Sequence, residues 1–248
     1  MPTAALGIIC KAPRAGMAKT RLAPMLGAGD AAVLSACFLR DVAAAIEAVP
    51  QSLGRKGFGV YSPAGCEAEL RAILPKSFEL VLQENADFGL VLLSAAHTFF
   101  ETGYDCAILV NSDSPTLPPD LLSEAIIALR LPGDRVVLGP AMDGGYYLIG
   151  LKVAHAEVFS DIPWSTADVL RRTVERAHDI GLAVVMLPAW YDVDDEGTFA
   201  LLKRELAGHR PPFAAASLVG GPAVTTRAFI EALGRRRTMP TMAAATSS

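Results

Sequence analysis

The sequence predicts an α/β protein built on a mostly parallel sheet. Short apolar runs rich in β-branched residues alternate with longer segments of helical periodicity, which is typical of a parallel sheet with helices on both faces. The 248 residues suffice for one such domain with a sizeable core, and the composition, 52% hydrophobic and 19% charged, is that of an ordinary globular chain. We expect one domain over residues 1–208 and a C-terminal extension over residues 209–248.

The strands are predicted where β-forming residues gather between turn residues. Six runs fit: Ala5–Cys10, Gly57–Tyr61, Phe78–Leu82, Cys106–Val110, Arg135–Gly139 and Ala183–Leu187. Segment 141–151 breaks the alternation, because two glycines followed by Tyr-Tyr-Leu-Ile are typical of a turn that leads into an antiparallel strand. We expect a small antiparallel addition there, at the binding edge of the sheet.

Helical periodicity fills the intervals between the strands. It covers Gly29–Ala48, Cys66–Leu74, Gly89–Thr102, Pro119–Leu129, Ala167–Ile180 and Glu196–Leu206. Pro119 suits the first turn of its helix, where a missing N–H costs nothing. A short helix over Val224–Arg236 is expected to pack on the domain, and the tail Thr238–Ser248 is expected to be disordered.

Charge and composition exclude several classes of protein. A net charge of −4 argues against a nucleic-acid partner. No apolar run reaches the ~18 residues that span a bilayer, and no signal peptide is visible. The four cysteines form no Cys-x-x-Cys pair, so a zinc or disulfide framework is not expected. We expect a cytoplasmic protein that binds small molecules and neither nucleic acid nor membrane.

The loop after the first predicted strand carries the strongest functional signal. Residues 11–24 read KAPRAGMAKTRLAP and hold two lysines and two arginines around Gly16. Glycine lets the backbone approach a ligand closely, and Lys and Arg suit phosphate oxygens. The loop is neither a Walker A sequence nor a Gly-x-Gly-x-x-Gly fingerprint. It favours nucleotide or sugar-phosphate binding; the alternative is an exposed basic loop.

Two acidic motifs are predicted to oppose this loop. Asp113, among Asn111, Ser112 and Ser114 at the end of a strand, belongs to a hard-oxygen set that suits Mg²⁺ or Mn²⁺, although the same residues favour a plain turn. If the first and fourth strands are neighbours, the cations and this carboxylate face each other across one cleft.

The second acidic motif, 192–196, crowds four carboxylates into five positions. Asp192 and Asp194 project to one side of an extended segment, and we favour Asp194 as the second metal ligand. The alternative for this motif is helix capping, a role that Asp195 and Glu196 also suit.

Two further loops are candidates for the acceptor or sugar site. Asp143 precedes two glycines that permit close approach to a ligand, and the following tyrosines offer stacking surface or hydroxyl donors; the alternative is a tight hairpin with core tyrosines. In Pro163-Trp164-Ser165-Thr166, the indole could wall an acceptor pocket or simply pack on the sheet, and a hydroxyl could cap the next helix.

With these motifs in hand, the chain resembles a bacterial family of nucleotide-diphospho-sugar transferase-like proteins, and its basic loop is similar to that of phospholactate guanylyltransferases and, more distantly, of molybdopterin nucleotidyltransferases. The matching blocks span most of residues 5–206: Lys11-Ala-Pro…Gly16…Lys19-Thr-Arg21-Leu, Ser112-Asp113-Ser-Pro115, Leu138-Gly-Pro…Asp143-Gly-Gly-Tyr-Tyr-Leu-Ile-Gly150, Pro163-Trp-Ser-Thr166 and Asp192-Val-Asp194. One block departs: where relatives carry Gly-x-Leu-Gly-x-Arg, this chain has Ala86-Asp-Phe-Gly-Leu-Val91.

The resemblance implies a single GT-A-type, Rossmann-like domain with a divalent metal at Asp113. It implies a nucleotide site formed by Lys11, Ala12, Pro13, Gly16, Lys19, Arg21 and Ser112, with Lys19 and Arg21 on phosphates. It places the acceptor or sugar near Gly144, Gly145, Tyr146, Trp164 and Ser165.

The combined expectation is a transferase that uses Mg²⁺ or Mn²⁺ and a nucleotide donor, either an NDP-sugar or an NTP, to modify a small acceptor. Lys19, Asp113 and Asp143 are the expected catalytic residues, with Asp143 as general base in glycosyl transfer. The alternative is a non-catalytic nucleotide or sugar-nucleotide binding protein on the same fold.

Overall fold

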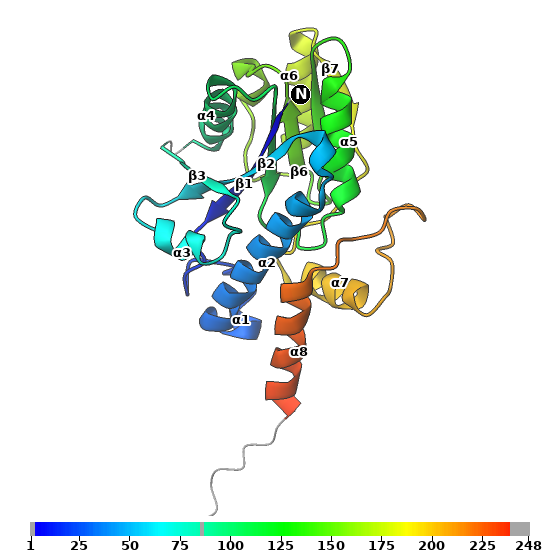
Figure 1. Cartoon of the computed structure of the whole chain (residues 1–248). Coiled ribbons are helices and arrows are strands. Elements are labelled where there is room, and N and C mark those ends of the chain that lie inside the picture. Colours follow the sequence, from blue (N-terminus) through cyan, green and yellow to red (C-terminus); the bar gives the residue numbers. More distant parts are fainter. Residues whose placement is uncertain (1–2, 85–86, 239–248) are drawn as a thin grey trace, which may run out of the picture.

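A seven-stranded mixed sheet forms the centre of the molecule (Figure 1). The computed structural model describes residues 3–84 and 87–238. The strand order is β3-β2-β1-β4-β6-β5-β7. The bounds are β1 (Ala4–Lys11), β2 (Arg55–Ser62), β3 (Glu79–Leu82), β4 (Cys106–Asn111), β5 (Arg135–Pro140), β6 (Tyr146–Leu151) and β7 (Ala183–Met186). All six runs predicted as strands are confirmed, and neighbouring strands are parallel except where β6 is involved.

The antiparallel strand β6 lies inside the sheet, between β4 and β5. It is therefore a central element of the sheet, and its turn, not the strand itself, lies at the binding edge. Tyr147 fixes β6 in place, because its ring covers Gly139 so closely that a β-carbon there would come 2.3 Å from the ring. Its hydroxyl donates a hydrogen bond to the Pro188 carbonyl at 3.0 Å, so Tyr147 is a core residue.

Helices cover both faces of the sheet, as predicted. The bounds are α1 (Ala23–Leu26), α2 (Ala28–Ala48), α3 (Glu67–Arg71), α4 (Phe88–Glu101), α5 (Pro119–Arg130), α6 (Val169–Asp179), α7 (Glu196–Leu206) and α8 (Val224–Thr238), with short 3-10 turns η1 (Gln51–Leu53) and η2 (Ala156–Phe159). One apolar core joins the sheet to α2, α5, α7 and α8; the other joins it to α4, η2 and α6. None of the described helices is long and apolar enough to cross a bilayer.

The sheet contains a topological switch point between β1 and β4. β1 pairs in parallel with β2 on one side and with β4 on the other. Ligands of open α/β sheets bind outside the carboxyl ends of strands at such a point. The basic loop follows β1 and the Asn111–Pro115 motif follows β4, so the fold brings these two predicted site segments to one edge.

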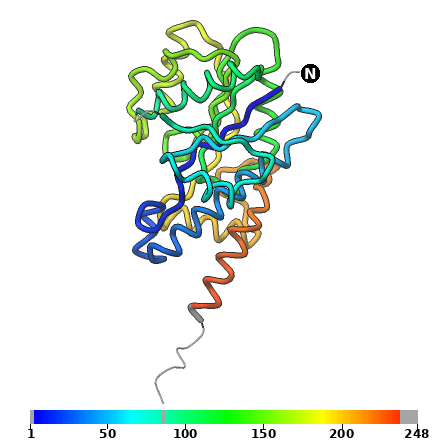
Figure 2. The backbone as a smooth tube through the Cα atoms, turned by 60° about the vertical axis from the view of Figure 1, so that its left-hand side comes forward, coloured from blue at the N-terminus to red at the C-terminus, as the bar shows by residue number. Residues whose placement is uncertain are grey.

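The C-terminal extension is joined to the body of the domain. Figures 1 and 2 show α8 lying beside α2, and Asp41 of α2 accepts the backbone N–H groups of Thr225 and Thr226 at 3.0 and 2.8 Å. Asp41 is only 5% exposed, so this carboxylate caps the first turn of α8 from inside the interface. The predicted helix is thus confirmed, whereas the expectation for the tail from residue 239 lies outside the described residues.

A half-buried carboxyl under this extension makes stability depend on pH. Glu205 accepts the Tyr191 hydroxyl proton at 2.5 Å, and Gly220 packs over it so tightly that a β-carbon would come 2.0 Å from Oε1. Burial raises the pKa of Glu205 above its usual range. The folded state therefore holds its proton to higher pH than the unfolded chain, and this carboxyl costs stability progressively as pH rises from the unfolded pKa through the folded one.

We expect Glu205→Gln to raise the Tm at pH 8, because the neutral amide removes the cost of burying the charge. At pH 4 the difference should vanish. Thermal unfolding of both proteins across that range checks this, with exposed Glu231→Gln as the control. A Tm at pH 8 below that of the wild type would contradict the assignment.

Candidate functional site

Lys19 is the centre of the candidate site. Its Nζ lies 2.7 Å from Asp113 Oδ1 and 2.8 Å from Asp194 Oδ1, and it donates a hydrogen bond to the Val193 carbonyl at 2.8 Å. The side chain is only 5% exposed, and its backbone has φ of 48°, which is unusual for a residue with a β-carbon. Three acceptors thus satisfy the three ammonium protons.

Backbone hydrogen bonds hold the two carboxylates beside each other. The Asp113 carbonyl accepts the Val193 N–H at 2.9 Å, which ties the segment before α7 to the end of β4. Asp195 Oδ1 accepts the Thr198 N–H at 2.8 Å in a capping box at the start of α7. The two interpretations of the acidic motif therefore apply to different residues: Asp195 caps the helix and Asp194 belongs to the site.

The donor set of Asp113 and Asp194 fits a divalent cation. Both carboxylates already converge on one positive charge, the Lys19 ammonium. Mg²⁺ commonly uses one or two protein carboxylates and completes its shell with phosphate and water. No cluster of three or more His, Cys, Asp or Glu suited to a metal occurs within residues 3–84 and 87–238. A metal ion bound by these same Oδ1 atoms would compete with the Lys19 ammonium.

Asp192 is a site residue that the sequence reasoning passed over in favour of Asp194. It lines a cavity beside the Lys19 centre, and burial raises its pKa to about 7, with further contributions from the negative charges of Asp143 and Asp194. The signal was available, because alternate residues of an extended segment share a side and Asp192 lies two positions before Asp194.

The cations of the basic loop do not all meet at one point. Arg14 forms a two-point ion pair with Glu69 of α3, at 2.6 and 3.1 Å, which holds it away from the carboxylates. Arg21 is exposed near Asp195, whose pKa is lowered chiefly by hydrogen bonds from Thr198 and to a small degree by Arg21. Lys11 is exposed at the end of β1.

The remaining predicted nucleotide-site positions are Ala12, Pro13 and Gly16 in the basic loop and Ser112 after β4. The Ala12 N–H donates to the Ser62 carbonyl at 3.0 Å, Pro13 follows it, and Gly16 has φ of 78°. Ser112 lies half-buried directly before Asp113, whose N–H donates to Asn111 Oδ1 at 3.3 Å. The turn and the ligand interpretations of this motif therefore coexist.

A cavity of about 230 Å³ collects most of the predicted acceptor residues. It is lined by Phe88, Asn111, Ala141, Asp143, Gly145, Tyr146, Trp164, Ser165, Thr166, Val169 and Asp192. Ser165 has φ of 65°, a strained backbone of the kind that often occurs at ligand sites. Trp164 both walls this cavity and packs edge-to-face on Phe88 and Tyr146, at centroid distances of 5.0 and 6.4 Å.

The structure adds three details to the predicted acceptor site. Gly144 packs against the backbone of Ala167, where a β-carbon would come 2.2 Å from the carbonyl oxygen. The hydroxyls of both tyrosines are buried, so only the Tyr146 ring reaches the cavity. Of the two hydroxyls offered as caps, that of Thr166 accepts the Asp168 N–H directly before α6, at 3.3 Å.

Comparisons with known proteins agree on the fold. A family model described as an uncharacterized protein conserved in bacteria (DUF2064) matches residues 45–166. A candidate nucleotide-diphospho-sugar transferase from Desulfovibrio desulfuricans G20 is 30% identical, with a TM-score of 0.79 over 97% of this chain and 100% of its own. No curated protein sequence matches the chain.

Two more distant structures share the fold alone. A CMP:2-keto-3-deoxy-manno-octonic acid synthetase complexed with CTP is 11% identical, with a TM-score of 0.54 over 83% of this chain and 99% of its own. A glucosyl-3-phosphoglycerate synthase from Mycobacterium tuberculosis, in complex with Mn²⁺, UDP and phosphoglyceric acid, is 12% identical, with a TM-score of 0.50 over 83% and 76%.

Proposed function

Because the chain belongs to the same family as the 30% identical nucleotide-diphospho-sugar transferase candidate from Desulfovibrio desulfuricans, and has a fold common to nucleotidyltransferases and glycosyltransferases, we propose that it is a metal-dependent transferase that uses a nucleotide donor. The observation that carries this proposal is the convergence of Lys19, Asp113 and Asp194 at the switch point between β1 and β4. The cavity of about 230 Å³, which is lined by two further carboxylates, Asp143 and Asp192, adjoins this centre.

The chain's own residues divide the work between donor and acceptor. Asp113 and Asp194 would hold Mg²⁺ or Mn²⁺, and the bound metal would neutralise charge on the donor phosphates. Lys19, released from these carboxylates, and Arg21 would bind the leaving phosphate, while the loop around Gly16 lets it approach the backbone. Asp143 would accept a proton from the acceptor.

The departure from the family pattern at residues 86–91 bears on the non-catalytic alternative. Val91 stands where relatives often carry arginine, and its side chain is buried, with 4% exposed. The chain therefore makes no charged contact from that position. A nucleotide-binding protein would also use the paired carboxylates for a metal, so measured turnover with a donor and an acceptor is the observation that separates the enzyme from this alternative.

Asp113→Asn tests the proposal. A nucleotide donor at a hundredfold excess over its Kd should raise the Tm of the wild type by about 5 °C or more in Mn²⁺, and EDTA should abolish the shift. The variant should lose the shift, because the amide cannot supply the second negative charge, while its own stability changes by about 1 kcal/mol or less.

The panel comprises NTPs and NDP-sugars, read by thermal shift and then by turnover. Asp120→Asn, on the first turn of α5, is the matched control and should keep the full shift. A shift that persists in EDTA, or in Asp113→Asn, would refute metal-dependent donor binding at this centre.

A further inference from the structure

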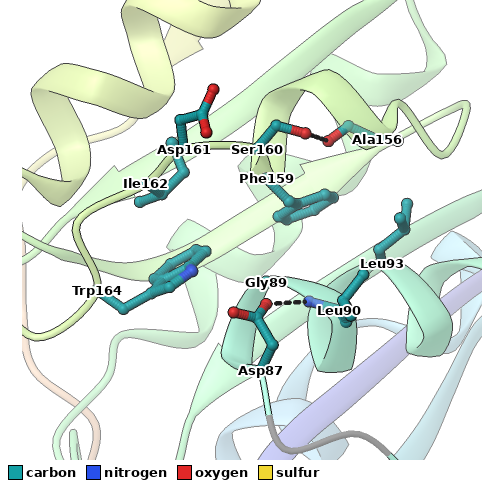
Figure 3. Close-up of a pocket in the computed structure, with 10 residues that line it drawn as sticks. All are labelled: Asp87, Gly89, Leu90, Leu93, Ala156, Phe159, Ser160, Asp161, Ile162 and Trp164. Carbon is teal, nitrogen blue, oxygen red and sulfur yellow. Dashed lines mark hydrogen bonds between the residues drawn. The ribbon is translucent and has the colours of Figure 1, made fainter.

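A second cavity, of about 460 Å³, shares Trp164 with the Asp143 cavity, and Figure 3 shows the residues that line it. The first turns of α4 form one wall, and η2 with the loop after it forms the other. Trp164 lines both cavities, so a ligand in the larger one has a direct neighbour in the smaller one. Gly89 allows this closeness, because a β-carbon there would come 2.8 Å from the Phe159 carbonyl and 3.2 Å from the indole.

The walls of this cavity are apolar and aromatic, with carboxylates on two sides. Figure 3 shows the Phe159 and Trp164 rings between Asp87 and Asp161, with Leu90 and Leu93 alongside. Aromatic and aliphatic surfaces suit the apolar face of a sugar ring, and carboxylate and hydroxyl oxygens accept hydrogen bonds from its hydroxyls.

The charges around the cavity argue against an anionic ligand. Among the described residues that line it there is no Lys, Arg or His, and the only ionisable groups are Asp87 and Asp161. Two arginines beside the lining segment are already engaged: Arg176 pairs with Asp161 and donates to the Ser160 carbonyl at 3.0 Å, and Arg172 donates to the Asp161 carbonyl at 3.5 Å. A phosphate placed here would face two carboxylates without a free counter-charge.

We propose that this cavity is the acceptor subsite, and that the acceptor is an uncharged, polyhydroxylated molecule of the sugar class that stacks on Trp164. The inference rests on the proposed function. It also selects glycosyl over nucleotidyl transfer to a phosphate, since the attacking group is a hydroxyl. Its oxygen bonds to the anomeric carbon and its proton passes to Asp143. The bond from that carbon to the diphosphate breaks, and the nucleoside diphosphate leaves with the electron pair.

Saturation-transfer NMR on the full chain with UDP and the diamagnetic Mg²⁺ tests the subsite without requiring turnover. The probes are methyl glycosides of glucose, galactose and mannose, together with glucose 6-phosphate. We expect a saturation-transfer signal from at least one neutral glycoside and none from glucose 6-phosphate. Trp164→Ala should weaken that glycoside about fivefold, because a stacked aromatic surface is lost.

A positive charge introduced at the mouth of the cavity should create binding of an anionic sugar, which provides a second test. Leu90 is 50% exposed, and Leu90→Lys should bring glucose 6-phosphate into the cavity. Ile127→Lys, at a 53% exposed position on α5, is the matched control and should leave binding as in the wild type.

The outcomes separate this inference from the proposed function. A stronger saturation-transfer signal from glucose 6-phosphate than from every neutral glycoside in the wild type would overturn the subsite. Silence of all sugars overturns it as well, and the thermal shift with donors in the same samples then shows whether donor binding survives.

Discussion

Lys19→Met should produce a protein that is less stable in EDTA and is rescued by Mn²⁺. The substitution removes the ammonium that lies between Asp113 and Asp194 and leaves two carboxylates beside each other. Breaking a fully buried ion pair costs about 3–5 kcal/mol. Here the two acidic side chains are 34% and 43% exposed, so water compensates and we expect a loss of about 1–2 kcal/mol.

The same variant separates the two cations that compete for these oxygens. In the wild type without nucleotide, Mn²⁺ should change the free energy of unfolding little, because the ammonium holds the position. In Lys19→Met, the vacant carboxylates should bind Mn²⁺ and recover the lost stability, whereas donor turnover should fall by about two orders of magnitude or more. Urea unfolding with increasing Mn²⁺ measures the first effect and steady-state kinetics the second.

Lys56→Met is the matched control, since Lys56 pairs with Glu79 on the surface at 2.9 Å. It should show neither the loss nor the rescue. If Lys19→Met and Lys56→Met have the same free energy of unfolding in EDTA, the Lys19 ammonium contributes nothing to stability at this centre.

Gly144→Ala is the second large effect and concerns stability alone. At φ of 93° the new β-carbon would come 2.2 Å from the Ala167 carbonyl oxygen, and this obstacle is backbone. The turn cannot retreat without losing the hydrogen bond from the Leu170 N–H to the Gly144 carbonyl, at 2.9 Å. We expect a loss of about 3 kcal/mol, from strain and from displacement of the α6 start.

The neighbouring glycine provides the comparison. Gly145→Ala would meet only the Asp143 side chain, at 3.2 Å, and should cost about 1 kcal/mol or less. Urea unfolding of the two variants measures the difference. Equal costs would mean that Ala167 can move aside, and the turn would then be a flexible one.

The sequence predicts the strands and helices well because their periods are local properties. It does not predict which strands adjoin β6, because Tyr-Tyr-Leu-Ile-Gly-Leu is apolar on both faces and suits several positions in a sheet. The short helix α1 was missed, since four residues in a Pro-containing loop carry no period.

At the candidate site, the sequence predicts which residues are candidates, but it does not predict which side chains they contact. The sequence identifies Lys19, Asp113 and Asp194 as functional candidates, but only the fold shows that one ammonium contacts both carboxylates. Likewise, Arg14 looks equivalent to Lys19 in the basic loop until α3 supplies Glu69. Gly144 shows the same limit: its conformational freedom is predictable, and the neighbour that requires it is not.

The contact between Asp41 and the start of α8 has a consequence for folding during synthesis. The carboxylate leaves the ribosome 184 residues before the Thr225 amide that it binds. Until then, the outer side of α2 and its buried acid face water, and the apolar residues that α8 later covers stay open to other chains. The packing of this side of α2 is therefore completed only once α8 has emerged, and slow translation would prolong the interval in which the chain is vulnerable to aggregation.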